Sequence, residues 1–345
     1  MENMQAAVLR NFNGDLSLER VKVPQISSNE VLVKVMAAGI CSTDLDIQDG
    51  KIESVNLPHI LGHEIAGIVE ACGENATNYK KGTRVLSSID IGCGICRFCI
   101  TGKKNLCLSL KRMGFERDGG YAQYVAIPEA NLVPFNESIS FEKAALIPDS
   151  VACMYHAIKG QGKVSGGDRV VIMGVGGLGF QGVQIAHYFG AEVFATSRHE
   201  EKLEIARNLG ADHVINTTHE NLYEGIMKAT EGEGCDVVFD NIGIEQSVQE
   251  ALRCVRYGGK VVTVGNAASS FTVDFMSVMF YEREIIGIRA SNRIDLIESI
   301  RLVEQGHIDP YLYSVRPLSE ANDALKLLRS NQNLGRTVLV PDHTL

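Results

Sequence analysis

The chain has 345 residues, of which 45% are hydrophobic, and this length allows about two domains with buried cores. Its formal net charge is -9 and it carries no long basic block, which argues against a nucleic-acid partner. The amino-terminal segment lacks a cationic stretch followed by an apolar one, and the longest apolar run, 170–186, is interrupted by glycines and glutamines. We therefore expect a cytoplasmic protein with no secretory signal and no membrane association.

The first 150 residues contain short alternating apolar stretches separated by Gly, Pro and Asn turns. Examples are "EVLVKVMAAGI" at 30–40, "HEIAGIVEAC" at 63–72 and "GYAQYVAIP" at 120–128. Alternation of this kind is typical of strands that bury one face, so this part of the chain is predicted to be a mainly β lobe.

Four of the nine cysteines lie in one short stretch, with the spacing C-x2-C-x2-C-x7-C; they are Cys93, Cys96, Cys99 and Cys107. Disulfides or free thiols are alternatives, but a reducing cytosol disfavours disulfides, and this spacing is typical of a closed zinc site. The glycines at 92 and 94 let the loop wrap around an ion, and Arg97, Lys103 and Lys104 partly offset the thiolate charge. Four thiolates leave no position for substrate, so this zinc ion would be structural.

From about residue 165 the pattern changes to buried strands that alternate with amphipathic helices, which predicts a doubly wound parallel sheet. The final segment predicts two more helices and a strand that return to the first lobe. The predicted strands are 168–174, 191–197, 212–217, 235–242, 260–266 and 284–290, and the predicted helices include 200–210 and 245–259, each closed by glycine.

The turn after the first of these strands reads "GVGGLG", in which Gly174, Gly176 and Gly179 form G-x-G-x-x-G between a strand and a helix. In this context the motif indicates dinucleotide binding: the first glycine makes the turn, the second admits a pyrophosphate and the third allows close helix packing. Gly177 and Leu178 complete the turn and belong to the candidate cofactor site. A glycine-rich turn that binds nothing is the alternative.

The end of the second strand carries Ser197 and Arg198, where an NAD-binding fold normally has an acidic residue for the ribose hydroxyls. A carboxylate would repel a 2'-phosphate, whereas a hydroxyl and a guanidinium can bind one. We therefore expect NADP(H) as cofactor. In the alternative interpretation Arg198 is a solvated residue, and Glu200 or Glu201 contacts the ribose.

Taken together, these motifs resemble the zinc-dependent medium-chain alcohol dehydrogenases over essentially the whole chain. Besides the cysteine lobe and "GVGGLG", the resemblance depends on "GICSTD" at 39–44, "GHEIAGIV" at 62–69 and "GRTVLV" at 335–340. It implies an α/β protein with a GroES-like β-rich catalytic domain, a Rossmann domain and an active site in the cleft between them. The implied boundaries are 1–155 for the catalytic domain, 91–110 for its structural-zinc lobe, 156–290 for the Rossmann domain and 291–345 for a segment returning to the catalytic domain.

The resemblance places a catalytic zinc ion on Cys41 and His63, with Asp149 at a position where the family often has Cys. A thiolate, an imidazole and a carboxylate leave one coordination position open. NADP-dependent secondary alcohol dehydrogenases also carry Asp there and a Ser-Arg pair after the second strand, although they lack the four-cysteine lobe. Taken singly, Cys41 could instead be a small buried residue, His63 a core histidine and Asp149 a turn residue.

Further roles follow from the same resemblance. Asp44 would accept the other imidazole N–H of His63, Glu64 would approach the metal transiently, and Thr43 would pass on the proton of the substrate oxygen. Asp46 stands where many members have a relay histidine, so the relay would run through water, through Asp46 or by another route. Lys202 would reach the adenosine ribose and Arg336 the pyrophosphate.

The expected function is hydride transfer between a secondary or polar alcohol and NADP(H), with zinc as Lewis acid and carbonyl reduction as the preferred direction. The expected cofactors are two Zn²⁺ ions per subunit and NADP(H), and the expected partners are a small alcohol or carbonyl compound and further copies of the chain, in a homodimer or homotetramer. A reductase of activated double bonds on the same fold, or a non-enzymatic cofactor-binding protein, are the alternatives.

Overall fold

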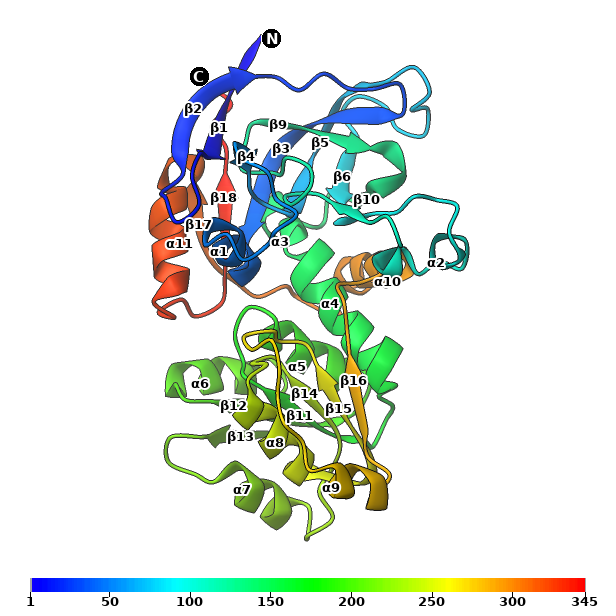
Figure 1. Ribbon diagram of the computed structural model, residues 1–345, viewed down its shortest axis with the longest axis vertical. Helices are drawn as coiled ribbons and strands as arrows, with labels where there is room; N and C mark the ends of the chain where they lie inside the picture. The colour runs from blue at the N-terminus through cyan, green and yellow to red at the C-terminus, as the bar shows by residue number, and fades with distance from the viewer. Residues whose placement is uncertain (1, 345) are drawn as a thin grey trace. The chain divides into compact units, whose positions relative to one another are not determined.

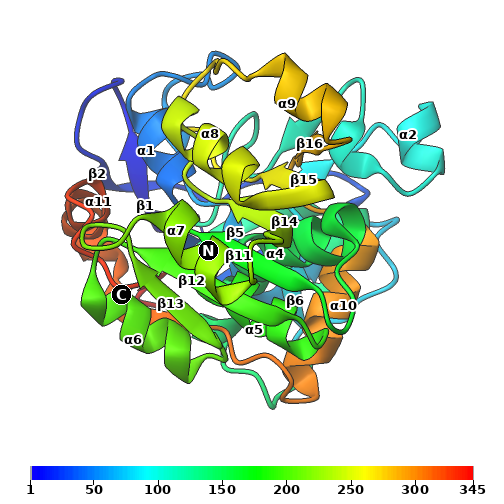
Figure 2. The ribbon, with the colours of Figure 1, turned by 90° about the horizontal axis from the view of Figure 1, so that it is seen from below.

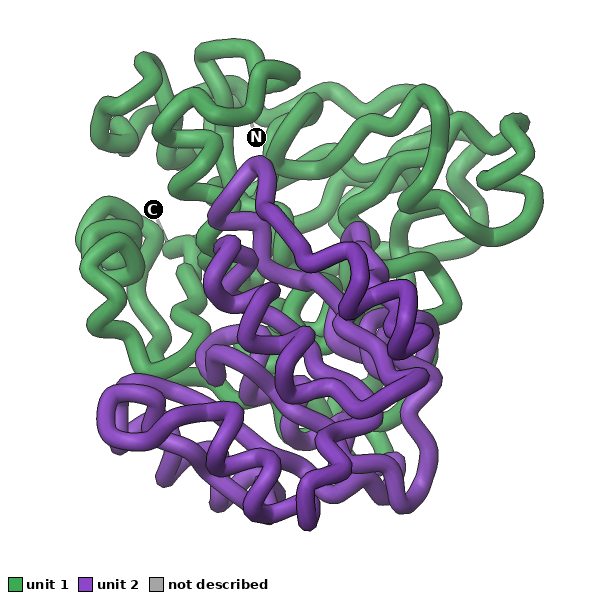
Figure 3. Tube along the Cα trace, turned by 60° about the horizontal axis from the view of Figure 1, so that its bottom comes forward, with its two compact units in different colours: residues 1–152, 291–345 green, residues 153–290 purple. Residues whose placement is uncertain are grey.

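The computed structural model describes residues 2–344, shown in Figure 1. Their contacts divide the chain into two units, coloured separately in Figure 3. The first unit extends to Ala152 and resumes at Ser291, and the second is Cys153–Ala290. Among the described residues, no helix combines the length and the apolar character that crossing a membrane requires.

The first unit is built on a seven-stranded sheet whose centre is β3, the 11-residue strand Glu30–Ile40. Its alternating apolar side chains are buried against a core shared with a three-stranded sheet, ordered β2-β1-β4. The large sheet has the order β10-β6-β5-β3-β18-β17, with β9 also paired to β3, and β7 and β8 form a separate pair. The strands before the second unit are β1 (Asn3–Leu9), β2 (Ser17–Lys22), β4 (His59–Ile60), β5 (Glu64–Cys72), β6 (Arg84–Ser87), β7 (Asp90–Ile91), β8 (Lys111–Arg112), β9 (Tyr124–Pro128) and β10 (Leu132–Pro134).

The carboxyl-terminal segment contributes two strands to this sheet. Strand β18 (Arg336–Val340) pairs antiparallel with β3, and β17 (Leu312–Pro317) pairs parallel with β18. The register sets Thr337 opposite Ile40, so the start of β18 lies beside the end of β3. Sequence analysis did not predict β17, because this edge strand alternates only between half-buried and exposed residues.

The helices of the first unit are short and lie mostly at the ends of strands. Helix α1 (Ser42–Gln48) begins directly after β3 and packs on α11 (Ala321–Arg329). The others are α2 (Arg97–Ile100), η1 (Lys104–Leu106), η2 (Glu129–Asn131), α3 (Phe141–Ala145), the π-helical turn η3 (Ile147–Val151), α10 (Arg293–Glu304) and η5 (Leu318–Glu320).

The second unit contains a six-stranded, wholly parallel sheet with the order β13-β12-β11-β14-β15-β16. This is the doubly wound order of a dinucleotide-binding fold, and Figure 2 shows helices on both faces of the sheet, α5 and α6 on one and α7 and α8 on the other. All six predicted strands are present: β11 (Arg169–Met173), β12 (Glu192–Ser197), β13 (His213–Asn216), β14 (Cys235–Asp240), β15 (Val255–Thr263) and β16 (Glu284–Gly287).

One helix boundary in this unit was predicted wrongly. Helix α8 ends at Cys254, and the strand β15 starts at Val255, so the residues 255–259 are not helical. Val255 pairs with Cys235 of β14 and the regular pairing resumes at Lys260 after a register shift, so strand pairing outweighs the weak helical pattern of these residues. The helices of this unit are η4 (His156–Gly162), α5 (Gly179–Tyr188), α6 (Glu200–Asn208), α7 (Leu222–Ala229), α8 (Glu245–Cys254) and α9 (Phe275–Phe280), with α4 (Ala152–Tyr155) at the boundary.

Candidate active site and metal centres

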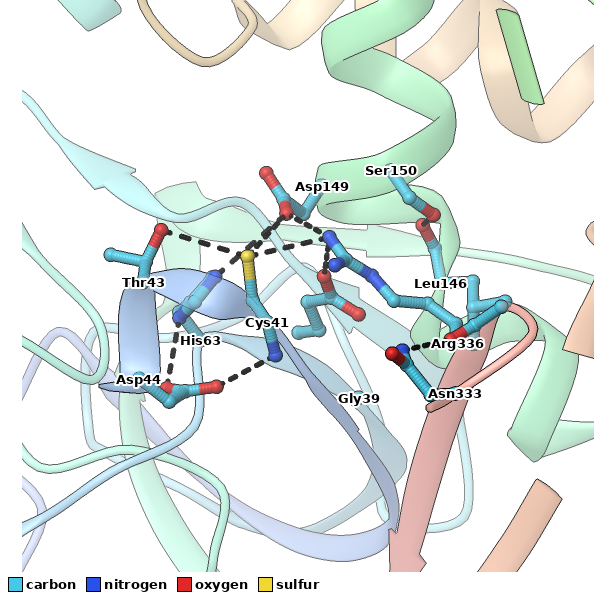
Figure 4. Close-up of polar contacts among 12 residues, drawn as sticks. Gly39, Cys41, Thr43, Asp44, His63, Leu146, Asp149, Ser150, Asn333 and Arg336 are labelled. Carbon is cyan, nitrogen blue, oxygen red and sulfur yellow. Dashed lines mark hydrogen bonds and ion pairs between the residues drawn. The ribbon is translucent and has the colours of Figure 1, made fainter. Parts of the chain in front are cut away.

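Four metal-ligating side chains meet inside the first unit: those of Cys41, His63, Glu64 and Asp149. Cys41 follows β3 and is the N-cap of α1, His63 directly precedes β5, Glu64 is the first residue of β5, and Asp149 lies in the π-helical turn η3. Their potential ligand atoms all lie within 4.8 Å of one another, and all four residues are buried. Figure 4 shows Cys41, His63 and Asp149 pointing toward a common point.

The spacing of these donors suits a zinc ion. The Sγ of Cys41 lies 3.4 Å from Oδ2 of Asp149, and Nε2 of His63 lies 3.8 Å from the same oxygen. Donors about 2.0–2.3 Å from a tetrahedral zinc ion lie about 3.3–3.8 Å from each other. The residues that the sequence analysis assigned to a catalytic metal therefore have both the chemistry and the separation to hold one.

The carboxylate of Asp44 lies beside two members of this group. Its Oδ1 lies 3.4 Å from Nδ1 of His63, and its Oδ2 accepts a hydrogen bond of 2.8 Å from the backbone N–H of Cys41. The hydroxyl of Tyr121 donates to the same Oδ2 at 2.8 Å. One buried carboxylate therefore orients two of the metal-ligating residues at once.

Sequence analysis missed Tyr121. Its ring is fully buried against Gly62, where a Cβ would come within 2.4 Å of the ring. Gly62 also has a φ of +94°, so two constraints require glycine at this position. The glycine that begins "GHEIAGIV" therefore indicated that another group packs closely on it, but nothing in this motif indicated which side chain that is.

Arg336 is the second residue whose place the sequence did not predict. The expectation put it at the cofactor pyrophosphate, whereas its buried guanidinium contacts the cluster: Nη2 lies 2.7 Å from Oε1 of Glu64 and donates to Oδ2 of Asp149 at 2.7 Å. The same nitrogen is 3.4 Å from the Sγ of Cys41. The register of β18 against β3 brings it here. A pyrophosphate contact stays a prediction.

The electrostatics of the cluster favour a bound cation. Burial lowers the pKa of His63, but Asp44 and Asp149 outweigh it and hold this pKa well above the ordinary value. Burial raises the pKa of Asp149, but His63 and Arg336 outweigh it, so that carboxyl stays ionised. The same carboxylate charge that raises the pKa of His63 is what a bound divalent cation would balance, and the imidazole must lose its proton to ligate one.

Thr43 and Asp46 both lie on α1 but face different surroundings. Oγ1 of Thr43 is 3.6 Å from the Sγ of Cys41, at the edge of the cluster. Asp46 instead pairs with Lys51 at 3.0 Å. Gln48, the last residue of the same helix, donates to the backbone oxygen of Gly14 and accepts a hydrogen bond from Arg329 of α11, so it contributes to packing.

The four cysteines of the lobe form the second metal-ligating group. The Sγ atoms of Cys93 and Cys99 are 4.0 Å apart and those of Cys96 and Cys107 are 3.9 Å apart, near the edge of a zinc-thiolate tetrahedron and far beyond a disulfide bond. All are free thiols, so the disulfide alternative is wrong for this structure. Backbone N–H groups of Cys99 and Leu108 lower the pKa of Cys96 to about 6, which favours the thiolate that zinc requires.

The glycine turn has the local geometry expected for a pyrophosphate. Gly174 has a φ of +79°, and a Cβ on Gly179 would lie 2.6 Å from the oxygen of Gly174, so the helix packs closely on the turn. A Cβ on Gly176 would meet nothing within 4 Å, which leaves space for a ligand beside that backbone. Gly177 and Leu178 lead into α5, whose N-cap is Leu178.

Ser197, Arg198 and Lys202 gather at the carboxyl end of β12. Ser197 is the last residue of the strand, Arg198 is exposed, and Lys202 is only 6% exposed. Burial, and next the charge of Arg198, lower the pKa of Lys202. Oε2 of Glu200 accepts a hydrogen bond of 3.1 Å from the side-chain amide of Asn216, which pairs with Ser197 in the sheet. This grouping suits an anion.

Comparison with known proteins identifies the family. The model of the alcohol dehydrogenase GroES-like domain matches residues 27–137, and that of the zinc-binding dehydrogenase matches 177–305. An alcohol dehydrogenase of Geobacillus stearothermophilus is 34% identical over 98% of this chain and 100% of its own length. This chain belongs to the zinc-dependent medium-chain alcohol dehydrogenases. The expected α/β fold, a GroES-like domain with a Rossmann domain, is thereby confirmed.

Two further relatives show the breadth of this dehydrogenase family. The sorbitol dehydrogenase of Bacillus subtilis is 37% identical over 76% of this chain and 75% of its own length. The structure of acetophenone reductase from Geotrichum candidum in complex with NAD matches with a TM-score of 0.89 and 30% identity, over 99% of this chain and 98% of that one. The dehydrogenase described here is thus an oxidoreductase of alcohols, and its relatives act on chemically different substrates.

Proposed function

We propose that this dehydrogenase interconverts a secondary or polar alcohol and its ketone or aldehyde with NADP(H), mainly toward carbonyl reduction. The observation that carries the proposal is the buried cluster of Cys41, His63 and Asp149, which has Thr43 at its edge. When bound there, a zinc ion supplies Lewis acidity that polarises the substrate oxygen.

The protein's own groups have distinct parts in this proposal. Cys41, His63 and Asp149 hold the metal, and Asp44 fixes the tautomer of His63 because it faces Nδ1. Thr43 donates a hydrogen bond to the substrate oxygen and moves its proton. Since Asp46 is paired with Lys51, we propose that the proton then reaches solvent through water.

The test of the function is NADPH consumption, with and without a zinc chelator, over aldehydes, ketones, sugar-like ketones and α,β-unsaturated carbonyls. Chelator-sensitive turnover of a simple carbonyl is the expected result. Reduction of activated double bonds alone, indifferent to the chelator, would instead establish the double-bond reductase.

The preference for NADP(H) is supported by the exposed guanidinium of Arg198 beside the buried Lys202. We expect Arg198→Ala to lower kcat/KM for NADPH by about 10- to 100-fold, the effect of losing one charge-assisted hydrogen bond of roughly 1.5–3 kcal/mol. The rate with NADH should change little. Steady-state kinetics with both cofactors measure this.

Lys228→Ala is the matched control, because Lys228 is an exposed cation of the same unit outside this grouping. It should leave both cofactors unaffected. Equal rates with NADH and NADPH in the unmodified enzyme would rule out the preference.

Thr43→Ala is expected to lower kcat by about 10²–10⁴-fold, the usual contribution of a positioned acid-base group, while NADPH binding is retained. Stopped-flow kinetics and fluorescence titration of NADPH separate the two effects. Ser42→Ala, at the exposed neighbouring position of α1, is the control. Loss of NADPH binding in Thr43→Ala would contradict the role.

We also propose a homodimer or homotetramer that works in the cytoplasm. Among residues 2–344, the edge strand β16 is paired on one side only, by β15, and Phe275 and Phe280 of the nearby α9 are 66% and 67% exposed. An unpaired edge beside exposed aromatic side chains favours association with a second copy. The nine free cysteines suit a reducing compartment.

A further inference from the structure

The two oxygens of the buried Asp44 carboxylate have different neighbours. Oδ2 accepts hydrogen bonds of 2.8 Å from the backbone N–H of Cys41 and from the hydroxyl of Tyr121. Oδ1 has no hydrogen-bond partner among residues 2–344 and lies 3.4 Å from Nδ1 of His63, and Figure 4 shows one oxygen directed at Cys41 and the other at His63. Resting on the proposed function, we propose that Tyr121 is a positioning residue whose hydroxyl fixes Oδ2 and so reserves Oδ1 for the metal-ligating imidazole.

The hydroxyl of Tyr121 has two acceptors within reach. It lies 2.8 Å from Oδ2 of Asp44 and 3.4 Å from the backbone oxygen of Gly39. The shorter contact is to the charged oxygen, where a hydrogen bond is about twice as strong as one between neutral groups. Burial, and next the charge of Asp44, hold the pKa of Tyr121 well above its ordinary value, so the hydroxyl keeps the proton that it donates.

The backbone around Tyr121 holds its side chain in one place. Residues 119–121 lie beside residues 60–62, which immediately precede His63, and backbone hydrogen bonds of 2.7–3.0 Å join the two stretches. The ring packs on Gly62 and is fully buried. Because both the backbone and the ring are fixed, the hydroxyl has a defined direction, and the residue that carries it is tied to the chain that leads into the metal-ligating histidine.

Asp44 depends on its donors because it is fully buried, where water cannot replace a missing hydrogen bond. With two donors on Oδ2 the carboxylate has one orientation, and Oδ1 stays directed at Nδ1 of His63. A proton held on Nδ1 leaves Nε2 free to ligate the metal, and Nε2 is the nitrogen that faces Asp149, at 3.8 Å. Tyr121 thus acts on the metal site through Asp44 and His63 and not by direct contact.

Tyr121→Phe removes the hydroxyl and keeps the ring that packs on Gly62. Oδ2 of Asp44 then retains one donor, the N–H of Cys41, and the carboxylate can turn away from His63. We therefore expect Co²⁺ in the catalytic site to bind about 10- to 100-fold more weakly, the usual effect of losing a hydrogen-bonding group behind a ligating histidine. The dissociation constant is measured on the full chain by competition with a chelator, with Zn²⁺ in the cysteine lobe.

The double variant with Asp44→Asn tests whether Tyr121 acts through Asp44. Without a second carboxylate oxygen to face Nδ1, orienting this side chain no longer helps the imidazole. Tyr121→Phe should then add little to the loss of Co²⁺ affinity that Asp44→Asn causes alone, and a purely structural role would not produce this non-additivity. The visible absorption of bound Co²⁺ should change in the same direction in both single variants, because both loosen His63.

Tyr79→Phe is the matched control, because the hydroxyl of Tyr79 also donates at 2.8 Å, to the backbone oxygen of Leu132, and neither residue belongs to a metal-ligating group. It should leave Co²⁺ binding unchanged. Unchanged or tighter binding in Tyr121→Phe, or a loss that adds fully to that of Asp44→Asn, would overturn the inference. Tyr121→Met, which also lacks a donor, serves if Tyr121→Phe does not fold. Absence of a thiolate-to-cobalt band in the unmodified protein would overturn the proposed function itself, a separate result.

Discussion

Cys41→Ser is expected to lower kcat/KM for carbonyl reduction by about 10²–10⁴-fold, which corresponds to the several kcal/mol that a Lewis-acid metal contributes. Serine preserves the size of the side chain, but its hydroxyl stays protonated and is a weak zinc ligand. The Sγ of Cys41 lies 3.4 Å from Oδ2 of Asp149, so the sulfur faces the other donors directly. The measurements are kcat/KM and zinc content per chain.

The matched control is Cys72→Ser. Cys72 is a half-buried thiol at the end of β5 whose Sγ is near the backbone oxygen of Tyr79, and it belongs to neither metal-ligating group. Its replacement should leave activity and zinc content unchanged. Binding of NADPH should survive in both variants, because the glycine turn lies in the other unit. A Cys41→Ser enzyme that keeps full activity would rule out Cys41 as a ligand.

Cys96→Ser is expected to release the zinc ion of the lobe, about one ion per chain, and to unfold the lobe locally. Within residues 92–110, only Asn105 and Cys107 are buried, and Ile95, Ile100 and Leu108 are 86%, 71% and 74% exposed. No apolar core can therefore hold this segment together without the metal. Hydrogen exchange should quicken by at least about tenfold in the lobe.

The rest of the first unit should keep its protection against exchange, since its core does not include the lobe. The catalytic group should also keep its metal. Metal analysis and peptide-resolved hydrogen exchange on the same sample test both points. A Cys96→Ser lobe that remained fully protected would show that contacts other than zinc stabilise it.

The elements that sequence analysis predicted well are those with a strong, continuous apolar pattern. The predicted strand 30–40 has the same first and last residues as β3. The six strands of the parallel sheet were predicted because each is a short buried run bounded by turn residues. The secondary-structure predictions that were missing or wrong concern segments whose apolar residues follow no strong period. Strand β17 lies at a sheet edge and buries little, and residues 255–259 carry no clear period.

The candidate site residues likewise fall into those that a local motif brings together and those that only the fold brings together. The cysteine tetrad and the glycine turn were recognised because chain connectivity alone brings their members together within one loop. The sequence analysis placed Arg336 at a cofactor phosphate, whereas in the structure it contacts Asp149, 187 residues earlier. That contact depends on the register of β18 against β3, which no local pattern reports.

The sequence by itself determined the kinds of ligand, the local spacings and the family to which they belong. Only the tertiary structure decided that Tyr121 supports Asp44 and that Arg336 neutralises Glu64 and Asp149. The physical reason is a difference in range along the chain. A local motif positions its side chains through the backbone geometry of a few neighbouring residues. A buried charge must be neutralised by a partner that can be far away in the sequence, and only the fold brings that partner close.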